Sequence, residues 1–346
     1  MRKLLLSTAI ASATLVASNA IAQTTISGSL DISYKMLSSD TATATTNSFN
    51  GFGKEAQINI QNKGKLNNGM DYAAGFSLED DGNQSTALFN ENTFINITSG
   101  NTTLHIGQDH IQNSDRTLAN FVGLIAEDLT NSTGTGLTAD VFLPSVGADP
   151  AQAFGIGIIQ NIPNFGTLSA LYVPSNTSGG AGGEDAGFDS ADESAYEVGF
   201  VGSLGVKGLT VHAFKNHADK SDPTTSINDV KGTNYGLSYN MGAVTAGYNY
   251  KKTQFTGTTA ATAGHGVTKQ NEFGLAYALT PKLTVAANYT KADPHSTLVD
   301  AKSKSLAIGY NLGPIALTAQ AAKLEDYTGV RNVDADVLYL RASTKF

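Results

Sequence analysis

Hydrophobic and polar residues alternate along most of the chain. In the stretch TISGSLDISYKM, from Thr25 to Met36, every second position is apolar or small and the positions between are polar or charged. Alternation with a period of two is typical of a β-strand whose two faces meet different surroundings. The pattern returns in runs that begin at Met70, Tyr196, Leu209, Tyr235, Val244, Phe273, Leu283 and Leu306. The chain is therefore predicted to consist of β-strands.

The predicted strands are joined by short and long connections in turn. Short ones, such as PNFGTL and LTPKL, carry the Gly, Asn or Pro residues of tight hairpin turns. Long ones are polar and begin at Leu37, Ser178 and Thr253. Short turns at one end and long loops at the other are typical of an outer-membrane barrel. We predict an all-β fold, a transmembrane antiparallel up-and-down barrel of about sixteen strands.

In such a barrel the apolar face meets lipid and the polar face lines a water-filled lumen. Closing the sheet also removes the unpaired strand edges, which lipid cannot hydrogen-bond. Tyrosines near strand ends fit the two interfacial girdles of a membrane barrel. These are Tyr34, Tyr72, Tyr196, Tyr248, Tyr250, Tyr289 and Tyr310.

The longest connection, residues 109–152, changes its period from two to that of a helix. Its apolar positions are Leu118, Phe121, Val122, Ile125 and Leu129, and its opposite face carries Arg116, Asn120, Gly123 and Glu127. This spacing predicts a short amphipathic helix. A helix on the surface of a loop would show the same pattern. We favour a loop that folds into the barrel, with its apolar face on the inner wall, and narrows the pore.

The N-terminus has the composition of a secretory signal peptide. Arg2 and Lys3 precede an apolar run from Leu4 to Ala17, and Ala20-Ile21-Ala22 matches a small-x-small cleavage site. The run is too short for a membrane-spanning helix. We expect residues 1–22 to be cleaved after export and residues 23–346 to form one transmembrane barrel domain.

Composition excludes several other functions. The net charge is −8, which makes nucleic acid a poor partner, and the absence of cysteine excludes disulfides. The six histidines lack metal-ligand spacing, and the acidic run from Glu184 to Glu193 lacks the spacing of a calcium loop. No hydrolase elbow or phosphate loop is present. We expect no catalytic residue, no metal and no cofactor.

Two other classes of protein keep the same alternation. An outer-membrane barrel enzyme could hold a Ser/His or Asp/His pair at its rim that no linear motif reveals. A secreted β-sandwich or adhesin also alternates, although its turns are of mixed length.

Several stretches together resemble the Gram-negative general porins. They are the AIAQTTISGSLDISY beginning, the KLNNGMDYAAGFSLED hairpin, the IPNFGTLSALY turn and the terminal Phe346. The resemblance implies a homotrimer of diffusion channels in the outer membrane, without enzymatic activity, with a third loop that constricts each pore. It implies outer-membrane lipid, lipopolysaccharide, and small hydrophilic solutes and ions as partners.

The same resemblance and the alternation assign the pore residues. The expected constriction residues are Asp115, Arg116, Asn120, Glu127 and Asp128. The expected pore-wall residues are Asp31, Lys35, Gln57, Asn59, Glu79, Asn96, His105, Asp109, Glu197, His212, Lys251, Glu272 and Arg341.

The expected wall charges favour cations slightly. General porins set an acidic third loop against a cluster of arginines, whereas the corresponding wall positions here carry Gln57, Asn59, Asn92 and Asn96. Carboxylates therefore lead narrowly among the wall charges. Screening within about 8 Å at physiological salt limits their effect, so we expect a weak preference for cations.

Overall fold

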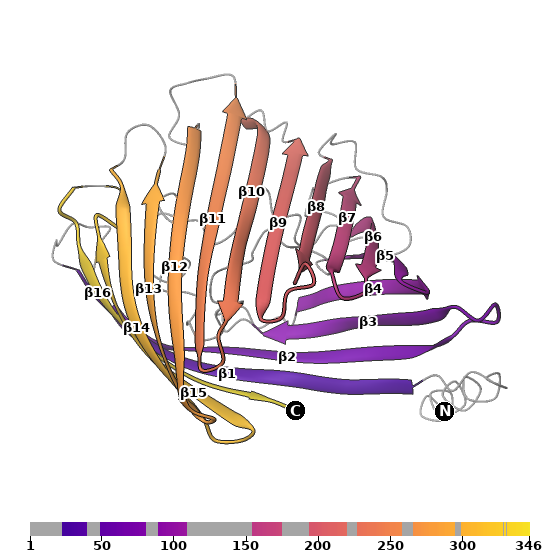
Figure 1. Ribbon diagram of the computed structural model, residues 1–346, viewed down its shortest axis with the longest axis horizontal. Coiled ribbons are helices and arrows are strands. Elements are labelled where there is room, and N and C mark those ends of the chain that lie inside the picture. The colour runs from indigo at the N-terminus through magenta and orange to yellow at the C-terminus, as the bar shows by residue number, and fades with distance from the viewer. Residues whose placement is uncertain are drawn as a thin grey trace, which may run out of the picture.

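The structure is a computed structural model that describes residues 23–39, 49–80, 89–108, 154–174, 194–219, 227–257, 266–294, 299–327, 329 and 331–346. In these ranges sixteen strands form one closed antiparallel sheet (Figure 1). They are β1 (Gln23–Ser39), β2 (Phe49–Lys65), β3 (Asp71–Asp80), β4 (Phe89–Ser99), β5 (Thr102–Gln108), β6 (Phe154–Ile162), β7 (Gly166–Val173), β8 (Ala195–Gly202), β9 (Leu209–Asp219), β10 (Ile227–Asn240), β11 (Val244–Gly257), β12 (Gly266–Thr280), β13 (Leu283–Asp293), β14 (Ala301–Asn311), β15 (Ile315–Glu325) and β16 (Ala335–Lys345).

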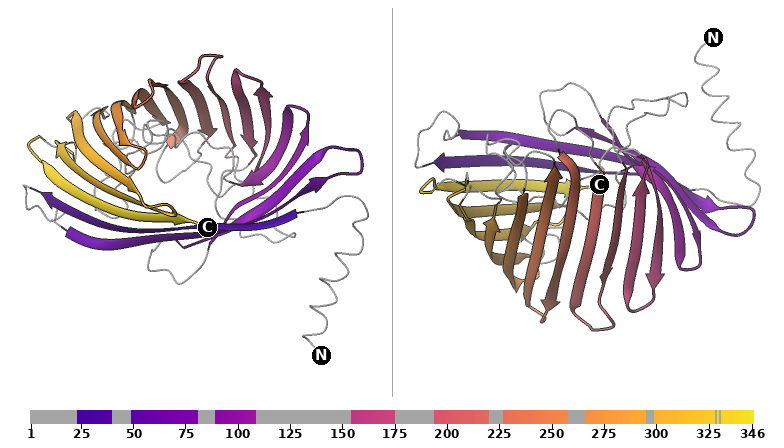
Figure 2. Two further views of the ribbon diagram at one scale, coloured as in Figure 1. Left: turned by 60° about the horizontal axis from the view of Figure 1, so that its bottom comes forward. Right: turned by 90° about the horizontal axis from the view of Figure 1, so that it is seen from above.

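Each strand pairs with its neighbours along the chain, and β1 pairs with β16 to close the ring (Figure 2). The predicted up-and-down barrel of sixteen strands is confirmed. The predicted helix, and the loop of residues 109–152 that would carry it, lie outside the described residues. Within the described ranges, no helix is both long and apolar enough to span a membrane.

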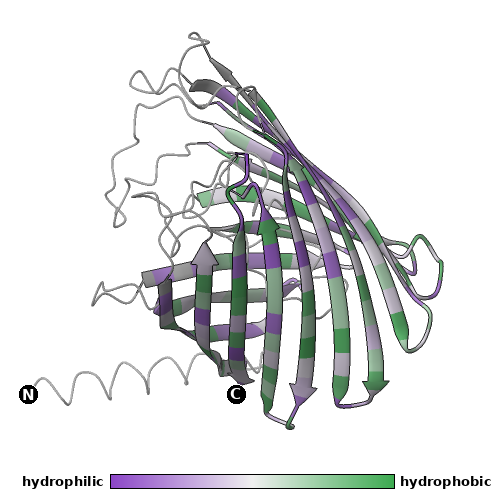
Figure 3. Cartoon of the chain, turned by 90° about the vertical axis from the view of Figure 1, so that its left-hand side faces the viewer, coloured by the Kyte–Doolittle hydropathy of each residue, from purple (hydrophilic) through white to green (hydrophobic). Residues whose placement is uncertain are grey.

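The two faces of the sheet differ as the alternation predicts, and Figure 3 shows apolar and polar bands alternating along the strands. On β12 the side chain of Leu275 is 50% exposed, whereas its neighbour Ala276 is 5% exposed. Leu237 and Ile308 are exposed on the same outer face, next to buried Ser238 and Ala307. The outside of a closed barrel carries the large apolar side chains, so this face fits contact with lipid.

Tight turns join the strands at one end of the barrel. After β10, the Asn240 side-chain oxygen accepts a hydrogen bond of 3.0 Å from the Gly242 amide. After β14, Asn311 accepts one of 2.7 Å from the Gly313 amide. Both glycines have positive φ, which a residue with a side chain rarely adopts. The Asn-x-Gly sequences therefore fix these hairpins.

The seam between β1 and β16 is closed by the last residue. Gly28 and Phe346 exchange two backbone hydrogen bonds, of 2.8 and 3.0 Å. A Cβ atom on Gly28 would lie 2.5 Å from the Phe346 ring and 2.7 Å from the backbone oxygen of Gln57, so a larger residue would disturb the strand pairing here. The terminal aromatic residue thus packs on the first strand.

Two apolar clusters lie on the inner face at the end opposite the tight turns. One includes Leu37, Leu324 and Val337, and the other includes Leu171 and Val230; all five side chains are buried. The polar composition predicts that a long connection begins at Leu37, but β1 continues to Ser39 and Leu37 faces inward, so that boundary is wrong. Apolar side chains therefore share the inner face with hydrogen-bonding ones.

Candidate functional site

A hydrogen-bonded network covers the inner face of β9 to β12. Nε2 of His212 lies 3.0 Å from Oδ1 of Asn234 and 3.0 Å from Oδ1 of Asn249. Asn249 in turn donates to Oε2 of Glu272 over 2.8 Å. The strand register brings these residues together, because Asn249 is directly opposite Glu272 and His212 is opposite Gly236. The lack of a side chain at Gly236 leaves room for the imidazole.

A buried ion pair belongs to the same network. Nζ of Lys251 lies 3.2 Å from Oε1 of Glu272, and the two side chains are 1% and 7% exposed. Gln270 donates a further hydrogen bond to Oε1. Buried charges are tolerated when they are paired and their remaining lone pairs are hydrogen-bonded. This part of the wall therefore holds two opposite charges that cancel.

A second ion pair crosses the seam of the barrel. Arg341 on β16 binds Asp31 on β1 through Nε and Nη2, with both N–O distances 2.9 Å. The two parallel contacts give the bidentate geometry that guanidinium and carboxylate groups favour. Like Lys251 and Glu272, these two charges cancel locally.

Strands β2 to β5 carry amides and one more histidine on the inner face. Gln57 donates to Glu79 over 3.2 Å, and Asn59 donates to Gln57 over 3.2 Å. Nδ1 of His105 lies 2.7 Å from Oδ1 of Asn96. The wall here is lined by amides and an imidazole that exchange hydrogen bonds, with Glu79 as the one carboxylate among the residues named.

The remaining wall assignments divide into two groups. Lys35 lies opposite Tyr339 across the seam, and Glu197 is buried on β8. Asp109 and the constriction residues Asp115, Arg116, Asn120, Glu127 and Asp128 lie outside the described residues, as do residues 1–22. The constriction therefore stays a prediction.

Sequence reasoning missed two aromatic side chains on the inner face. Phe94 stacks on His105 with ring centroids 6.4 Å apart, and Phe214 stacks on His212 at 5.4 Å. Both phenylalanines are buried at positions that alternation assigns to polar residues. Phe94 is two residues from Asn96, and Phe214 is two residues from His212. Because residues two apart share a face of the strand, this spacing is a signal that the two phenylalanines face inward.

The chemistry of this inner face is that of a polar lining. Amides, hydroxyls and balanced charges bind water and polar solutes by hydrogen bonds. Within the described ranges, one group of side chains has the composition and spacing of a metal site, namely His217, Asp219 and Asp229. It lies on the outer face of β9 and β10, away from the inner wall.

Comparison with known proteins gives a family and a fold. A family model described as Gram-negative porin matches residues 7–329. No curated protein sequence matches the chain.

Solved structures share the architecture. An anion-selective porin from Comamonas acidovorans is 17% identical and superimposes with a TM-score of 0.64, covering 94% of this chain and all of that one. OmpT of Vibrio cholerae, an outer-membrane protein, is 12% identical with a TM-score of 0.65, covering 94% and 98%. A mutant of Rh. blastica porin is 14% identical with a TM-score of 0.61, covering 94% and 100%. At these identities the likeness shows the fold alone.

Proposed function

Because the chain belongs to the Gram-negative porin family and resides in the outer membrane, we propose that it forms a water-filled channel for passive diffusion of small hydrophilic solutes and ions. One observation carries this proposal. The sixteen-stranded sheet is closed, and the middle of its inner face carries hydrogen-bonding groups while its outer face carries large apolar ones. A closed sheet of this size leaves an aqueous lumen.

Conductance tests the proposal directly. Folded protein added to a planar lipid bilayer should produce stepwise, ohmic increases in current. Folding is checked separately by the change in gel mobility on boiling. Protein that passes this check but produces no steps would contradict the proposal.

The proposed channel prefers cations weakly. The pairs Lys251–Glu272, Asp31–Arg341 and Lys65–Asp71 each bring opposite charges together, and other inward charges include Glu55, Glu79 and Glu197 as well as Lys35, Lys63 and Lys345. The two signs balance among these wall residues, so the proposed preference rests on Asp115, Glu127 and Asp128 in the proposed constriction. The Comamonas porin is described as anion-selective, but selectivity depends on individual side chains, which a fold shared at 17% identity does not fix.

Neutralising the acidic residues of the proposed constriction should weaken this preference. We expect the Glu127→Gln/Asp128→Asn double variant to lower the cation-to-anion permeability ratio. An ion at the narrowest point passes close to these charges, within the distance of about 8 Å over which salt screens them. The measurement is the reversal potential in a salt gradient. The matched control is Asp189→Asn/Asp192→Asn, in another loop. Anion selectivity in the unchanged channel, or equal effects of the two double variants, would contradict the proposed constriction.

We also propose that the channel is a homotrimer, as the porin resemblance implies. The segment from Asp80 to Leu88 corresponds to the loop that reaches a neighbouring subunit in the family. Cross-linking in mild detergent should give trimers that dissociate on boiling. A cross-linking pattern of monomers alone would argue against a trimer.

Outer-membrane lipopolysaccharide is the proposed lipid partner. Three lysine pairs lie directly opposite each other on the outer face at the end away from the tight turns: Lys252 and Lys269, Lys291 and Lys302, and Lys304 and Lys323. Like charges directly opposite destabilise a sheet. Carboxylates offset part of this repulsion, because Lys291 pairs with Asp300 and Lys304 pairs with Glu325. Phosphate groups of lipopolysaccharide would offset the rest, which supports an orientation with the long connections outside the cell.

A further inference from the structure

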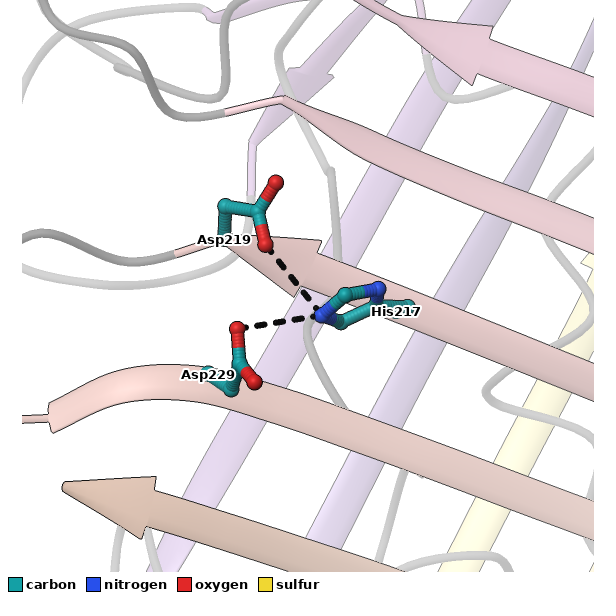
Figure 4. Close-up of side chains that lie close together, drawn as sticks. All are labelled: His217, Asp219 and Asp229. Carbon is teal, nitrogen blue, oxygen red and sulfur yellow. Dashed lines mark hydrogen bonds and ion pairs between the residues drawn. The ribbon is translucent and has the colours of Figure 1, made fainter.

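Three side chains of metal-binding type converge on the outer face of β9 and β10 (Figure 4). His217 and Asp219 are two residues apart on β9 and so share one face. Asp229 on β10 is directly opposite Asp219 in the strand register. Nε2 of His217 lies 3.2 Å from Oδ1 of Asp219 and 3.1 Å from Oδ1 of Asp229. Both carboxylates therefore approach the same ring nitrogen.

Hydrogen bonding alone leaves this arrangement incomplete. In any protonation state Nε2 of His217 carries at most one hydrogen, so the two carboxylates must share it, as two amide oxygens share Nε2 of His212. Asp219 and Asp229 are also like charges directly opposite each other, which destabilises a strand pair. Lys231 offsets part of the Asp229 charge, and a cation between the three groups would bind both carboxylates and offset the rest.

The spacing of the three groups fits a small divalent ion. Zinc binds histidine nitrogen and carboxylate oxygen at about 2.0–2.2 Å, which sets two ligand atoms about 3.3 Å apart in a tetrahedral site. The distances of 3.1 and 3.2 Å from the imidazole nitrogen agree with this value. One ligand atom from each residue lies within 4.8 Å of the others. The Asp219 side chain is 53% exposed, so its carboxylate has room to rotate closer to Asp229.

Neighbouring groups orient the three side chains. Ser194 donates to Oδ2 of Asp219 over 3.4 Å, and Lys231 donates to Oδ2 of Asp229 over 3.2 Å. Each carboxylate therefore keeps Oδ1 directed towards His217. The ring of Tyr196 packs edge-on against the imidazole at 5.4 Å. Partners of this kind commonly orient metal ligands.

The geometry points to a site for a divalent transition-metal ion such as Zn²⁺, bound by Nε2 of His217 and one carboxylate oxygen each of Asp219 and Asp229. With three protein ligands, a tetrahedral ion keeps one position for water or another oxygen ligand. The ion would connect Asp219, the last residue of β9, to Asp229 near the start of β10. The site is separate from the channel wall, so it does not depend on the proposed conduction.

Metal titration of the folded full chain tests this site. The protein, freed of metal with EDTA and held in detergent at pH 7.5, is titrated with Zn²⁺ by calorimetry and with Co²⁺ by visible absorption. We expect one saturable equivalent and the absorption of tetrahedral Co²⁺. His217→Ala should weaken binding at least a hundredfold, and Asp219→Asn and Asp229→Asn at least tenfold each. Gel mobility before and after boiling shows that each variant is folded.

Asp293→Asn is the matched control. Asp293 is an exposed carboxylate at the corresponding end of β13, opposite Lys269, and this variant should bind Zn²⁺ as the unchanged protein does. Loss of binding in the three site variants alone would support the site. Absence of saturable binding in the unchanged protein, or Zn²⁺ binding that His217→Ala and Asp219→Asn leave intact, would overturn it.

Discussion

Replacing Glu272 by glutamine should lower the free energy of unfolding by about 3–5 kcal/mol. The substitution keeps the shape of the side chain but removes its charge, so Lys251 loses the carboxylate 3.2 Å from its ammonium group. Both side chains are almost fully buried, and little water can replace the lost partner. Urea titration of protein folded in lipid vesicles, followed by tyrosine fluorescence, measures the change.

Asp71→Asn is the matched control for this prediction. Asp71 lies 2.7 Å from Lys65, which is closer than the buried pair, but the two side chains are 60% and 64% exposed. Water screens this pair, so the variant should lose less than about 1 kcal/mol. Adding Lys251→Met to Glu272→Gln should recover part of the lost stability, because it removes the buried charge that has lost its carboxylate. Equal losses in Glu272→Gln and Asp71→Asn would show that burial does not govern the strength of the inner pair.

Replacing Ile308 by arginine should destabilise the inserted barrel by about 2–4 kcal/mol. Ile308 lies on the outer face of β14 between Leu306 and Tyr310, in the middle of the apolar band, and is 45% exposed. A guanidinium group there must enter hydrocarbon or pull water and lipid headgroups towards it. Leu237 and Leu275 should respond in the same way. Folding titrations in vesicles report the loss.

Thr284→Arg tests the other face at the same depth. Val285 on β13 is directly opposite Ile308, and the preceding residue, Thr284, therefore lies at nearly the same depth in the membrane. Thr284 faces inward and is opposite Gly309. Arginine there extends into the aqueous lumen, where Gly309 leaves space, so we expect a much smaller loss of stability. If the two variants were equally destabilised, the assignment of lipid-facing and lumen-facing residues would be wrong.

The alternation predicts most of the sheet because one face of every strand contacts lipid and the other faces the lumen. Lipid selects Leu237 and Leu275 on one face, water selects Ser238 and Glu272 on the other, and a shift of one residue would exchange them. The turns are also predictable, since Asn240 and Gly242 carry the local hydrogen bond that forms the hairpin.

Contacts between strands are harder to predict than the strands themselves. His212 meets Asn249 only because β10 lies between their strands in a fixed register. Strand β4 has a β-bulge near Asn92, which has positive φ. Three residues of β4 span the same length as two residues of β3 there, so the inward positions of β4 shift by one residue after the bulge. The approach of Asp229 to His217 likewise depends on the register between β9 and β10. The constriction assigned to residues 109–152 stays a prediction.

The seam between β1 and β16 has a consequence for the order of folding. Asp31 and Arg341, which bind across it, are 310 positions apart. Bringing together the ends of so long a segment costs about 3 kcal/mol more in chain entropy than closing a ten-residue hairpin. Each of the fifteen pairings between consecutive strands brings β1 and β16 closer together, so the entropy cost of joining them falls with every pairing that forms first. We therefore expect the seam to form last. Until then both edge strands can pair with other chains, so the yield of refolding should fall as protein concentration rises.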